Sequence, residues 1–292
     1  MYIYTTNQYV MDKFGEKLYK LSLNAGTTCP NRDGKVGTGG CIFCSASGSG
    51  DFAGDASLDI DAQIEKEKKR ISGKCKCNRY IAYFQAFTST YGDPVILKDK
   101  FMAAAMRDDI AAVSIASRPD CFSDEIIEVI RQLSLIKPVW IELGLQTIHD
   151  RTADIINRGY PLYVFEETMA RLLPLNVHII VHMIIGLPGE TKEDIIDTAR
   201  YIANSGANGI KLQLLHVLKN TVLEHMYLKG ELDVLTLEEY ADILCDCIKV
   251  LPKDMVIHRY TGDGPKNILV VPLWSSDKKS VLNYLNKRIR EL

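Results

Sequence analysis

The sequence has no apolar run that approaches the ~18 residues needed to cross a membrane as a helix. Its first residues lack a basic segment followed by an apolar stretch, so we expect no secretory signal peptide. A net charge of −2 excludes a strong overall field that would draw the protein onto nucleic acid or a membrane surface. We therefore expect a cytoplasmic protein with no membrane partner, which would meet a polyanion only through a local basic patch.

Histidine is absent from the first 148 residues, and the cytosol disfavours disulfides, yet the chain holds eight cysteines. Cytosolic cysteines that cluster in the sequence indicate metal or redox chemistry. Three of them share one glycine-rich loop, CPNRDGKVGTGGCIFC, in which eleven residues separate Cys29 from Cys41 and two separate Cys41 from Cys44. This loop is the first candidate for a functional site.

Two kinds of metal site are compatible with the loop. Structural zinc normally takes four ligands in two pairs, and only Cys41 and Cys44 have pair spacing, so zinc would need a distant fourth ligand such as Cys75 or Cys77. Three thiolates suit a [4Fe–4S] cluster with one iron left open for chemistry, and a glycine-rich loop lets backbone N–H groups turn toward the sulfurs. The spacing favours the cluster and leaves zinc as the alternative.

The remaining cysteines are not expected to share a ligand set with the loop. Cys245 and Cys247 fall in a helical pattern at 235–251, and residues two apart on a helix do not face each other, so we expect small core or surface residues. Cys75 and Cys77 precede a strand with a spacing that is poor for a shared metal, and Cys121 is expected to be incidental.

Strand patterns alternate with helical patterns along most of the chain, which is typical of a parallel sheet covered by helices. We predict an α/β fold with six βα units, in which Ser123 and Thr191 are helix N-caps. We expect one domain over 1–292, with a core at about 15–250 and a short mixed C-terminal extension at about 251–292. The predicted strands lie at 18–24, 79–91, 110–117, 138–146, 177–186 and 208–217.

Four of these strands carry polar side chains on one face and aliphatic side chains on the other. Isolated polar groups in a packed core would be costly, so their recurrence indicates a lumen lined for a polar ligand, although any one of Glu142, His182 and Lys211 could have a purely structural role. We predict a partial (β/α)6 TIM-like barrel, open on one side, with its site at the carboxyl ends of the strands. The polar faces comprise Tyr83, Gln85 and Phe87; Trp140, Glu142 and Gln146; His178, Ile180, His182 and Ile184; and Lys211, Gln213 and Leu215.

A cysteine loop after the first strand of such a chain resembles the radical S-adenosylmethionine (SAM) enzymes. The usual spacing in that family is three and then two residues, from which this chain departs, but the longer spacing is similar to the YhcC/YtqA-type subgroup. That subgroup is related to the radical SAM part of the Elongator acetyltransferase subunit. The resemblance covers roughly residues 10 to 290 and rests on CPNRDGKVGTGGCIFC, YFQAFTSTY, SRPD, IELGLQT, NRGY, GLPGET, LLHVLKNT and VPLW.

The resemblance implies a role for individual residues. The three loop cysteines would ligate three irons of the cluster, and the fourth iron would bind the amine and carboxylate of SAM. Arg158 would meet the methionine carboxylate, because arginine geometry favours that charge-assisted pairing. The other implied SAM contacts are Phe43 against adenine, Gln85 near the amine, Ser117 and Glu142 at the ribose or methionine part, and Ile184, Gly186 and Leu187 bordering the adenine.

The resemblance also implies the chemistry. The reduced cluster, supplied with electrons by a donor such as flavodoxin or ferredoxin, would cleave SAM to methionine and a 5′-deoxyadenosyl radical that abstracts hydrogen from the substrate. YtqA-type members suggest transfer RNA (tRNA) as substrate, with conversion of the 5-carboxymethylaminomethyl group of wobble uridine to 5-aminomethyl. A radical SAM enzyme acting on a small metabolite or peptide is the alternative, and a non-catalytic Fe–S or zinc module is the least favoured.

Sequence support for RNA contact is limited to two basic stretches. The C-terminal stretch SSDKKSVLNYLNKRIREL offers Lys287, Arg288 and Arg290 as candidate phosphate contacts. A solvated helix face explains the same pattern equally well. The second stretch is EKEKKRISGKCKCNR.

Overall fold

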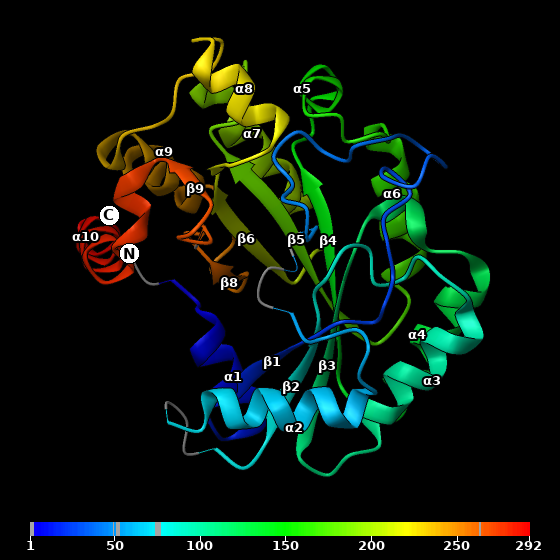
Figure 1. The fold of residues 1–292 in the computed structure, drawn as a ribbon. Coiled ribbons are helices and arrows are strands. Elements are labelled where there is room, and N and C mark those ends of the chain that lie inside the picture. Colours follow the sequence, from blue (N-terminus) through cyan, green and yellow to red (C-terminus); the bar gives the residue numbers. More distant parts are fainter. Residues whose placement is uncertain (1–2, 49, 51–52, 74–76, 263) are drawn as a thin grey trace.

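The fold is organised around one parallel sheet of seven strands, in the order β1-β2-β3-β4-β5-β6-β8 (Figure 1). The computed structural model describes residues 3–48, 50, 53–73, 77–262 and 264–292. The first six strands lie where six were predicted, although β2 ends at Phe84 and not at 91, and each pairs in parallel with the next. They are β1 Tyr19–Leu23, β2 Tyr80–Phe84, β3 Ile110–Ser117, β4 Val139–Gln146, β5 Val177–Ile185 and β6 Gly209–Leu214.

The seventh strand comes from the segment assigned to the C-terminal extension. β8 (Val256–Arg259) pairs in parallel with β6 and forms the far edge of the sheet. At four residues it is too short to be separated from a loop by pattern alone, so the predicted count of six strands was one too low. The rest of the extension contains β9 (Leu269–Val271), which pairs antiparallel with the two-residue β7 (Val217–Leu218) outside the main sheet.

Helices connect the parallel strands and begin where the sequence signals predict. Ser123 accepts a hydrogen bond from the backbone N–H of Ile126, and Thr191 forms a capping box with Asp194, as expected from their N-cap positions. The connecting helices are α2 Ile60–Ile71, α3 Pro94–Ala105, α4 Asp124–Ser134, α5 Asp150–Ile155, α6 Leu162–Leu172, α7 Lys192–Asn204 and α9 Leu237–Lys249. None of the described helices combines the length and apolar composition that crossing a bilayer requires.

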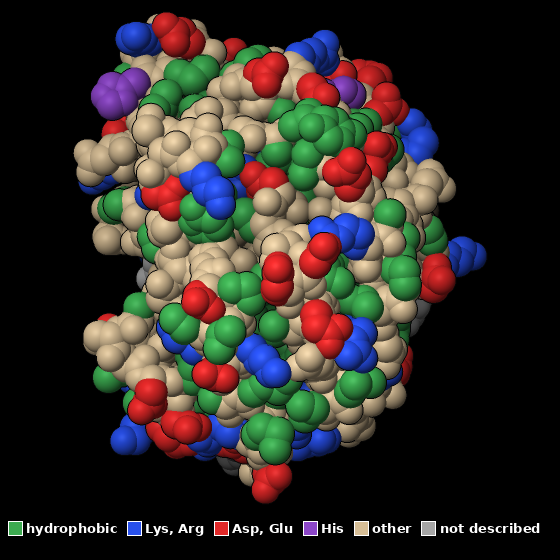
Figure 2. All heavy atoms as spheres, turned by 90° about the vertical axis from the view of Figure 1, so that its right-hand side faces the viewer, with side chains coloured by type: hydrophobic (Ala, Val, Ile, Leu, Met, Phe, Trp, Pro, Cys, Tyr) green, Lys and Arg blue, Asp and Glu red, His purple; other side chains and the backbone are tan. Residues whose placement is uncertain are grey.

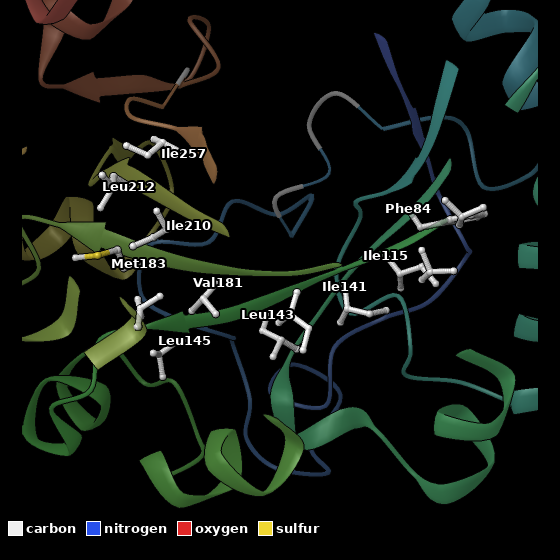
Figure 3. Close-up of a cluster of buried hydrophobic side chains, with 14 of the residues drawn as sticks. Phe84, Ile115, Ile141, Leu143, Leu145, Val181, Met183, Ile210, Leu212 and Ile257 are labelled. Atoms are coloured by element: carbon white, nitrogen blue, oxygen red, sulfur yellow. The ribbon is translucent and has the colours of Figure 1, made fainter. Parts of the chain in front are cut away.

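The two faces of the sheet differ, as their alternation predicts. Figure 3 shows aliphatic side chains from neighbouring strands gathered on one face, where the helices pack. Among them are Ile141, Leu143, Val181, Met183 and Leu212, all buried. The opposite face curves around the lumen, so the strands form the open half-barrel that the pattern indicates.

The amino-end of the barrel is closed by an element that the sequence analysis did not predict. α1 (Thr6–Phe14) packs against β8, and its Tyr9 ring stacks on His178 with ring centroids 4.5 Å apart. Val10 of α1 joins a small buried cluster with Trp140 and Ile180. The lumen therefore has an aromatic and apolar base, and its polar groups lie toward the carboxyl ends of the strands.

Three short peripheral helices and one longer helix complete the described part of the chain. α8 (Val222–Leu228) follows β7, the 3-10 helix η1 (Pro119–Cys121) follows β3, and η2 (Leu273–Ser276) leads into α10 (Lys278–Arg290), which packs on α9. Figure 2 views the molecule from the right-hand side of Figure 1, where α3 and α4 lie, and shows basic and acidic side chains interspersed on that face.

Candidate active site

A cavity of about 400 Å³ lies inside the half-barrel, and every strand of the seven-stranded sheet contributes to its wall. The polar lumen faces predicted from alternation are brought together here. One lining residue from each strand, in chain order, is Ser22, Tyr83, Ser117, Glu142, His182, Lys211 and Arg259. The loop after β1 covers the carboxyl end of the same cavity.

The three cysteines of that loop all line the cavity. The Cys41 thiol shares a hydrogen bond with Cys44, and this bond, together with burial and the proximity of Cys44 and Cys29, raises the pKa of Cys41 well above its usual value. The positive charge of Arg118 lowers the pKa of Cys41 and partly offsets this rise, so a guanidinium lies near the thiols. Three thiols and a cation thus face one enclosed space.

The cysteine loop is held in place by the segment that follows α5. The side-chain amide of Asn157 donates to the Gly40 carbonyl at 2.8 Å, and the backbone N–H of Ile42 donates to the Ile156 carbonyl at 3.1 Å. Within the loop, the Arg32 guanidinium donates to the carbonyl oxygens of Ser45 and Ala46 at 2.6 and 3.1 Å. The NRGY motif therefore supports the loop rather than forming an independent site.

Glycine is required where the loop passes closest to this arginine. Gly40 has a φ of +82°, which side chains rarely adopt, and a Cβ there would lie 2.8 Å from Nε of Arg32. The glycine content of the loop thus allows a compact turn that directs its thiols inward.

The thiols fit a cluster better than a single metal ion. Across the residues that the structure describes, no three His, Cys, Asp or Glu side chains come together as ligands for one metal ion. A [4Fe–4S] cluster does not need such convergence, because each thiolate binds its own iron. An open cavity beside the thiols leaves room for a ligand on the remaining iron.

The residues expected to contact SAM divide into two groups. Phe43, Gln85, Ser117, Glu142, Arg158 and Ile184 line the cavity.

Gly186 and Leu187 lie behind the cavity wall. Leu187 packs in a buried cluster with Ile42 and Ile184, and Phe43 lies against that cluster. A Cβ at Gly186 would come within 3.1 Å of Leu235, so close packing accounts for this glycine. The adenine border predicted for these two residues would thus be supported indirectly, through Ile184 and Phe43.

Arg158 has a different environment from the one expected of a methionine carboxylate partner. It is buried, with 1% of its surface exposed, and its guanidinium donates to the carbonyl oxygens of Leu145, Thr147 and Tyr160 at 2.9, 2.5 and 3.0 Å. A third nitrogen donates to Asp150. All three nitrogens of Arg158 donate within the protein and organise the carboxyl end of β4. The residue also lines the cavity, so its contact with the methionine carboxylate stays a prediction.

Arg118 is a cation beside the thiols that the site prediction missed. It lines the cavity, pairs with Asp120 at 2.7 Å, and interacts electrostatically with Cys29 and Cys41. The signal was present in the sequence, because Arg118 belongs to the SRPD motif from which only Ser117 was selected. Ser117 itself shares a 2.5 Å hydrogen bond with Thr90.

Glu142 is the centre of a buried polar network in the lumen. One carboxylate oxygen accepts from Lys20 at 2.5 Å and from Ser114 at 2.7 Å. The other accepts from Tyr83 at 3.0 Å, from His182 at 2.8 Å and from Lys211. Both oxygens are therefore committed to the protein, and contact with the ribose or methionine part of SAM would have to compete with these bonds.

The protonation behaviour of the network follows from burial and charge. Burial opposes the charge of Glu142, but Lys20, Lys211 and His182 hold its pKa well below the usual value. Burial lowers the pKa of Lys211 to about 7, against the pull of Glu142 and with help from Lys20 and Arg259. Burial likewise lowers the pKa of His182 to about 4, so His182 is neutral at physiological pH.

The other sequence-predicted residues lie away from the cavity. Cys245 and Cys247 are buried on α9 within the main core, as small core residues. Cys121 is buried in η1, and its thiol donates to Asp120. Cys75 lies outside the described residues, so the expectation for its pairing with Cys77 is not tested.

The candidate RNA contacts are on α10, which packs on α9 and contributes nothing to the wall of the cavity as far as the described residues show. Lys287 and Arg290 are exposed. Arg288 pairs with Asp242 of α9, so its charge is partly compensated within the protein. This arrangement is typical of a solvated helix face, and the geometry does not connect it to the lumen.

The family follows from a comparison with known families. The model described as the Radical SAM superfamily matches residues 24–202, more than half of the chain. The chain belongs to the radical SAM superfamily. The match begins at the end of β1 and includes the cysteine loop, and a second model, described as the Radical_SAM C-terminal domain, matches residues 207–291. As a radical SAM enzyme, the chain uses a [4Fe–4S] cluster and SAM.

Similar proteins place the chain in the expected subgroup. It is 41% identical to YtqA of Bacillus subtilis, over 98% of this chain and 89% of YtqA. It is 31% identical to YhcC of Escherichia coli K12, over 96% of this chain and 89% of YhcC. The solved structure of Elp3 from Methanocaldococcus infernus has the same fold, with a TM-score of 0.68 at 16% identity over 93% of this chain and 64% of that one.

The name of a more distant relative includes a substrate. The tRNA uridine(34) acetyltransferase of Methanocaldococcus infernus is 22% identical over 185 residues, which is 61% of this chain and 33% of that protein.

Metal analysis gives the first test of the cysteine loop. Protein reconstituted anaerobically with iron and sulfide is expected to bind about four irons per chain and to absorb broadly in the visible, as thiolate-ligated clusters do. The measurement is iron, sulfide and zinc content together with the absorption spectrum. Stoichiometric zinc without iron in anaerobically purified protein would show that the loop holds the alternative metal.

Proposed function

We propose that this radical SAM enzyme modifies the wobble uridine of tRNA, converting its 5-carboxymethylaminomethyl group to 5-aminomethyl. The relative named tRNA uridine(34) acetyltransferase supports a tRNA uridine as the substrate class. The observation that carries the proposal is the lumen itself. It is a small polar chamber beside the thiols, in which basic side chains outnumber carboxylates, and it suits a compact anionic group at the end of a longer substrate.

The proposed reaction is a two-electron oxidation followed by hydrolysis. The cluster and SAM supply the radical chemistry when bound. The CH₂ between the amine and the carboxylate loses a hydrogen atom and then an electron and a proton, which gives an imine. Water then splits the imine into the 5-aminomethyl group and a two-carbon aldehyde acid. Bound SAM would supply the two-electron oxidant, so no further oxidant would be needed.

The residues of the chain have three tasks in this scheme. Cys29, Cys41 and Cys44 hold the cluster, with Arg118 as the neighbouring cation. The half-barrel surrounds the reacting carbon during hydrogen abstraction, and its open side admits the water that hydrolyses the imine. Lys211, whose pKa is lowered to about 7, can hold or release a proton near neutral pH while the imine is hydrolysed.

A small metabolite or peptide is the second candidate substrate, and the position of α10 favours it. The candidate RNA contacts Lys287, Arg288 and Arg290 lie on a helix that does not border the cavity, and Arg288 is paired with Asp242. The proposed contact of α10 with tRNA therefore requires that the RNA extends from the cavity to this helix. A metabolite enzyme would need no such surface.

Nucleoside analysis of tRNA tests the proposal. Cells that lack the gene are expected to accumulate 5-carboxymethylaminomethyl uridine and to lose 5-aminomethyl uridine, because the proposed step removes the carboxymethyl group. The measurement is mass spectrometry of hydrolysed tRNA from deletion and parent strains, with the wild-type gene and its Cys44→Ala variant as complementation controls. Identical nucleoside profiles in the two strains would support the small-molecule alternative.

A further inference from the structure

The charges that line the cavity do not balance. Five Lys or Arg side chains border it, against one carboxylate, Glu142, among the residues for which the structure gives a position. Most of these cations have a protein partner: Arg118 has Asp120, Arg158 has Asp150, and Lys211 has Glu142. Arg32 donates to backbone carbonyls of the cysteine loop, and the fifth cation is Arg259.

Arg259 differs from the others in its position and in its lack of a partner. It is the last residue of β8, at the open edge of the half-barrel, where it is exposed. Within the described part of the chain, neither an ion pair nor a hydrogen bond engages its guanidinium, while its charge acts on both Lys211 and Tyr83. Arg259 thus lines the lumen, and no carboxylate of the described residues pairs with it.

Lys211 and Arg259 are register partners on adjacent strands, so their side chains leave the sheet side by side. The positive charge of Arg259 disfavours the charged form of Lys211, so the two side chains repel each other. Glu142 cannot compensate both, because its two oxygens already accept hydrogen bonds from Lys20, Ser114, Tyr83, His182 and Lys211. An anion from outside the chain would relieve this repulsion.

The size and depth of the space decide which anion fits. Lys211 is 5% exposed and lies inside a cavity of about 400 Å³, so only the end of a group that enters the lumen can reach it. A phosphate within an RNA backbone is flanked by two nucleosides and would not pass to this depth. A carboxylate at the end of a flexible substituent would.

We propose that Lys211 and Arg259 form a subsite for a carboxylate carried by the substrate, with Arg259 at the entrance and Lys211 inside. The inference rests on the proposed function, in which the reacting CH₂ is bonded directly to such a carboxylate. Anchoring this group would place that CH₂ within the chamber that the cysteine loop covers. The arginine fork suits the two carboxylate oxygens.

Binding measurements on holoenzyme with SAM and an oxidised cluster test the subsite without turnover. The probes are one tRNA carrying 5-carboxymethylaminomethyl uridine and the same tRNA carrying 5-aminomethyl uridine. The wild type is expected to bind the first about tenfold more tightly, as for one charge-assisted hydrogen bond. Arg259→Gln is expected to lose this preference while binding the second tRNA unchanged, and Arg259→Lys is expected to retain part of it.

The matched control is Lys253→Gln, which removes one exposed positive charge before β8 from a residue that does not line the cavity. It is expected to keep the wild-type preference. Equal weakening of both tRNAs by Arg259→Gln would show that Arg259 meets a backbone phosphate. A full preference in Arg259→Gln would also overturn the subsite, although the proposed function would stand.

A probe without RNA separates the two proposals. Equal binding of the two tRNAs by the wild type would overturn the subsite. If the wild type binds neither tRNA, the proposed function fails, and N-methylglycine then tests the subsite with methylamine as the control. A rise in the unfolding temperature with N-methylglycine that is absent in Arg259→Gln would support the carboxylate subsite for another substrate. The same response in both proteins would overturn it.

Discussion

Cys41→Ala is expected to abolish the reductive cleavage of SAM. Cys41 lies at the centre of the thiol group, because it shares a hydrogen bond with Cys44 and interacts with Cys29. Two remaining thiolates cannot hold a cluster that needs three, so iron content and SAM cleavage are lost together. The measurement is the production of 5′-deoxyadenosine under dithionite, with iron content and the circular dichroism spectrum measured on the same samples. Product should fall to the level of protein-free controls.

Matched substitutions on α9 separate the loss of a ligand from a general effect of losing a cysteine. Cys245→Ala and Cys247→Ala remove thiols buried in the main core, remote from the cysteine loop in the fold. Each is expected to lower the unfolding temperature slightly and to leave SAM cleavage intact, because only packing changes. Activity in Cys41→Ala, or its loss in a well-folded α9 variant, would contradict the assignment of the loop as the cluster site.

The half-barrel could be predicted from the sequence because each strand carries two different patterns. Aliphatic residues such as Ile141 and Leu143 mark the face that packs on helices, and Glu142 between them marks the lumen. This alternation depends only on the residues of one strand, so it can be recognised without knowing which strands are its neighbours. The family comparisons and the sheet topology confirm both the family and the architecture that the motifs indicated.

The errors arose where local pattern carries little information. β8 was assigned to the extension because four residues are too few to show an alternating pattern. Arg259, at the end of β8, lies beside an irregularity in the pairing with β6, and the alternation of side chains does not reveal this irregularity. α1 contains both polar and apolar residues, and its sequence alone does not indicate its position. Its role in closing the barrel depends on contacts of Tyr9 with Trp140 and His178.

The chemistry of individual side chains was only partly visible. Lys20 and Ser22 share the lumen face of β1, so the same alternation would have found Lys20 had that strand been included. Arg158 shows the opposite case. Its residue type suggests a carboxylate partner, but in the fold its guanidinium donates to carbonyl oxygens. A local sequence pattern does not predict that the segments carrying these oxygens come close to Arg158.

Glu142→Gln is expected to destabilise the protein by about 3–5 kcal/mol, the cost of removing one partner from a buried ion pair. The Glu142 side chain has no exposed surface and compensates both Lys20 and Lys211. Neutralising it would leave the half-buried ammonium of Lys20 and the buried amine of Lys211 without their counter-charge. Urea unfolding at neutral pH measures the loss, and the dependence of the free energy on urea should keep its slope.

The dependence on pH follows from the lowered pKa of Glu142 in the folded protein. The contribution of its charge is fully present above the unfolded pKa of about 4.5 and is lost as the pH falls through the lower folded value. The difference in stability between the wild type and Glu142→Gln should therefore be largest at neutral pH and should shrink below about pH 4.5.

Two further variants decide whether charge compensation is the cause. Glu128→Gln breaks an exposed pair with Arg131 on α4 and is expected to leave the unfolding midpoint nearly unchanged. Glu142→Gln combined with Lys211→Met removes one of the two uncompensated cations, so it is expected to recover part of the lost stability and to fold even where the single variant does not. A double variant less stable than Glu142→Gln alone would show that Lys211 stabilises the lumen independently of its charge partner, and the cluster would then be a packing feature rather than an electrostatic one.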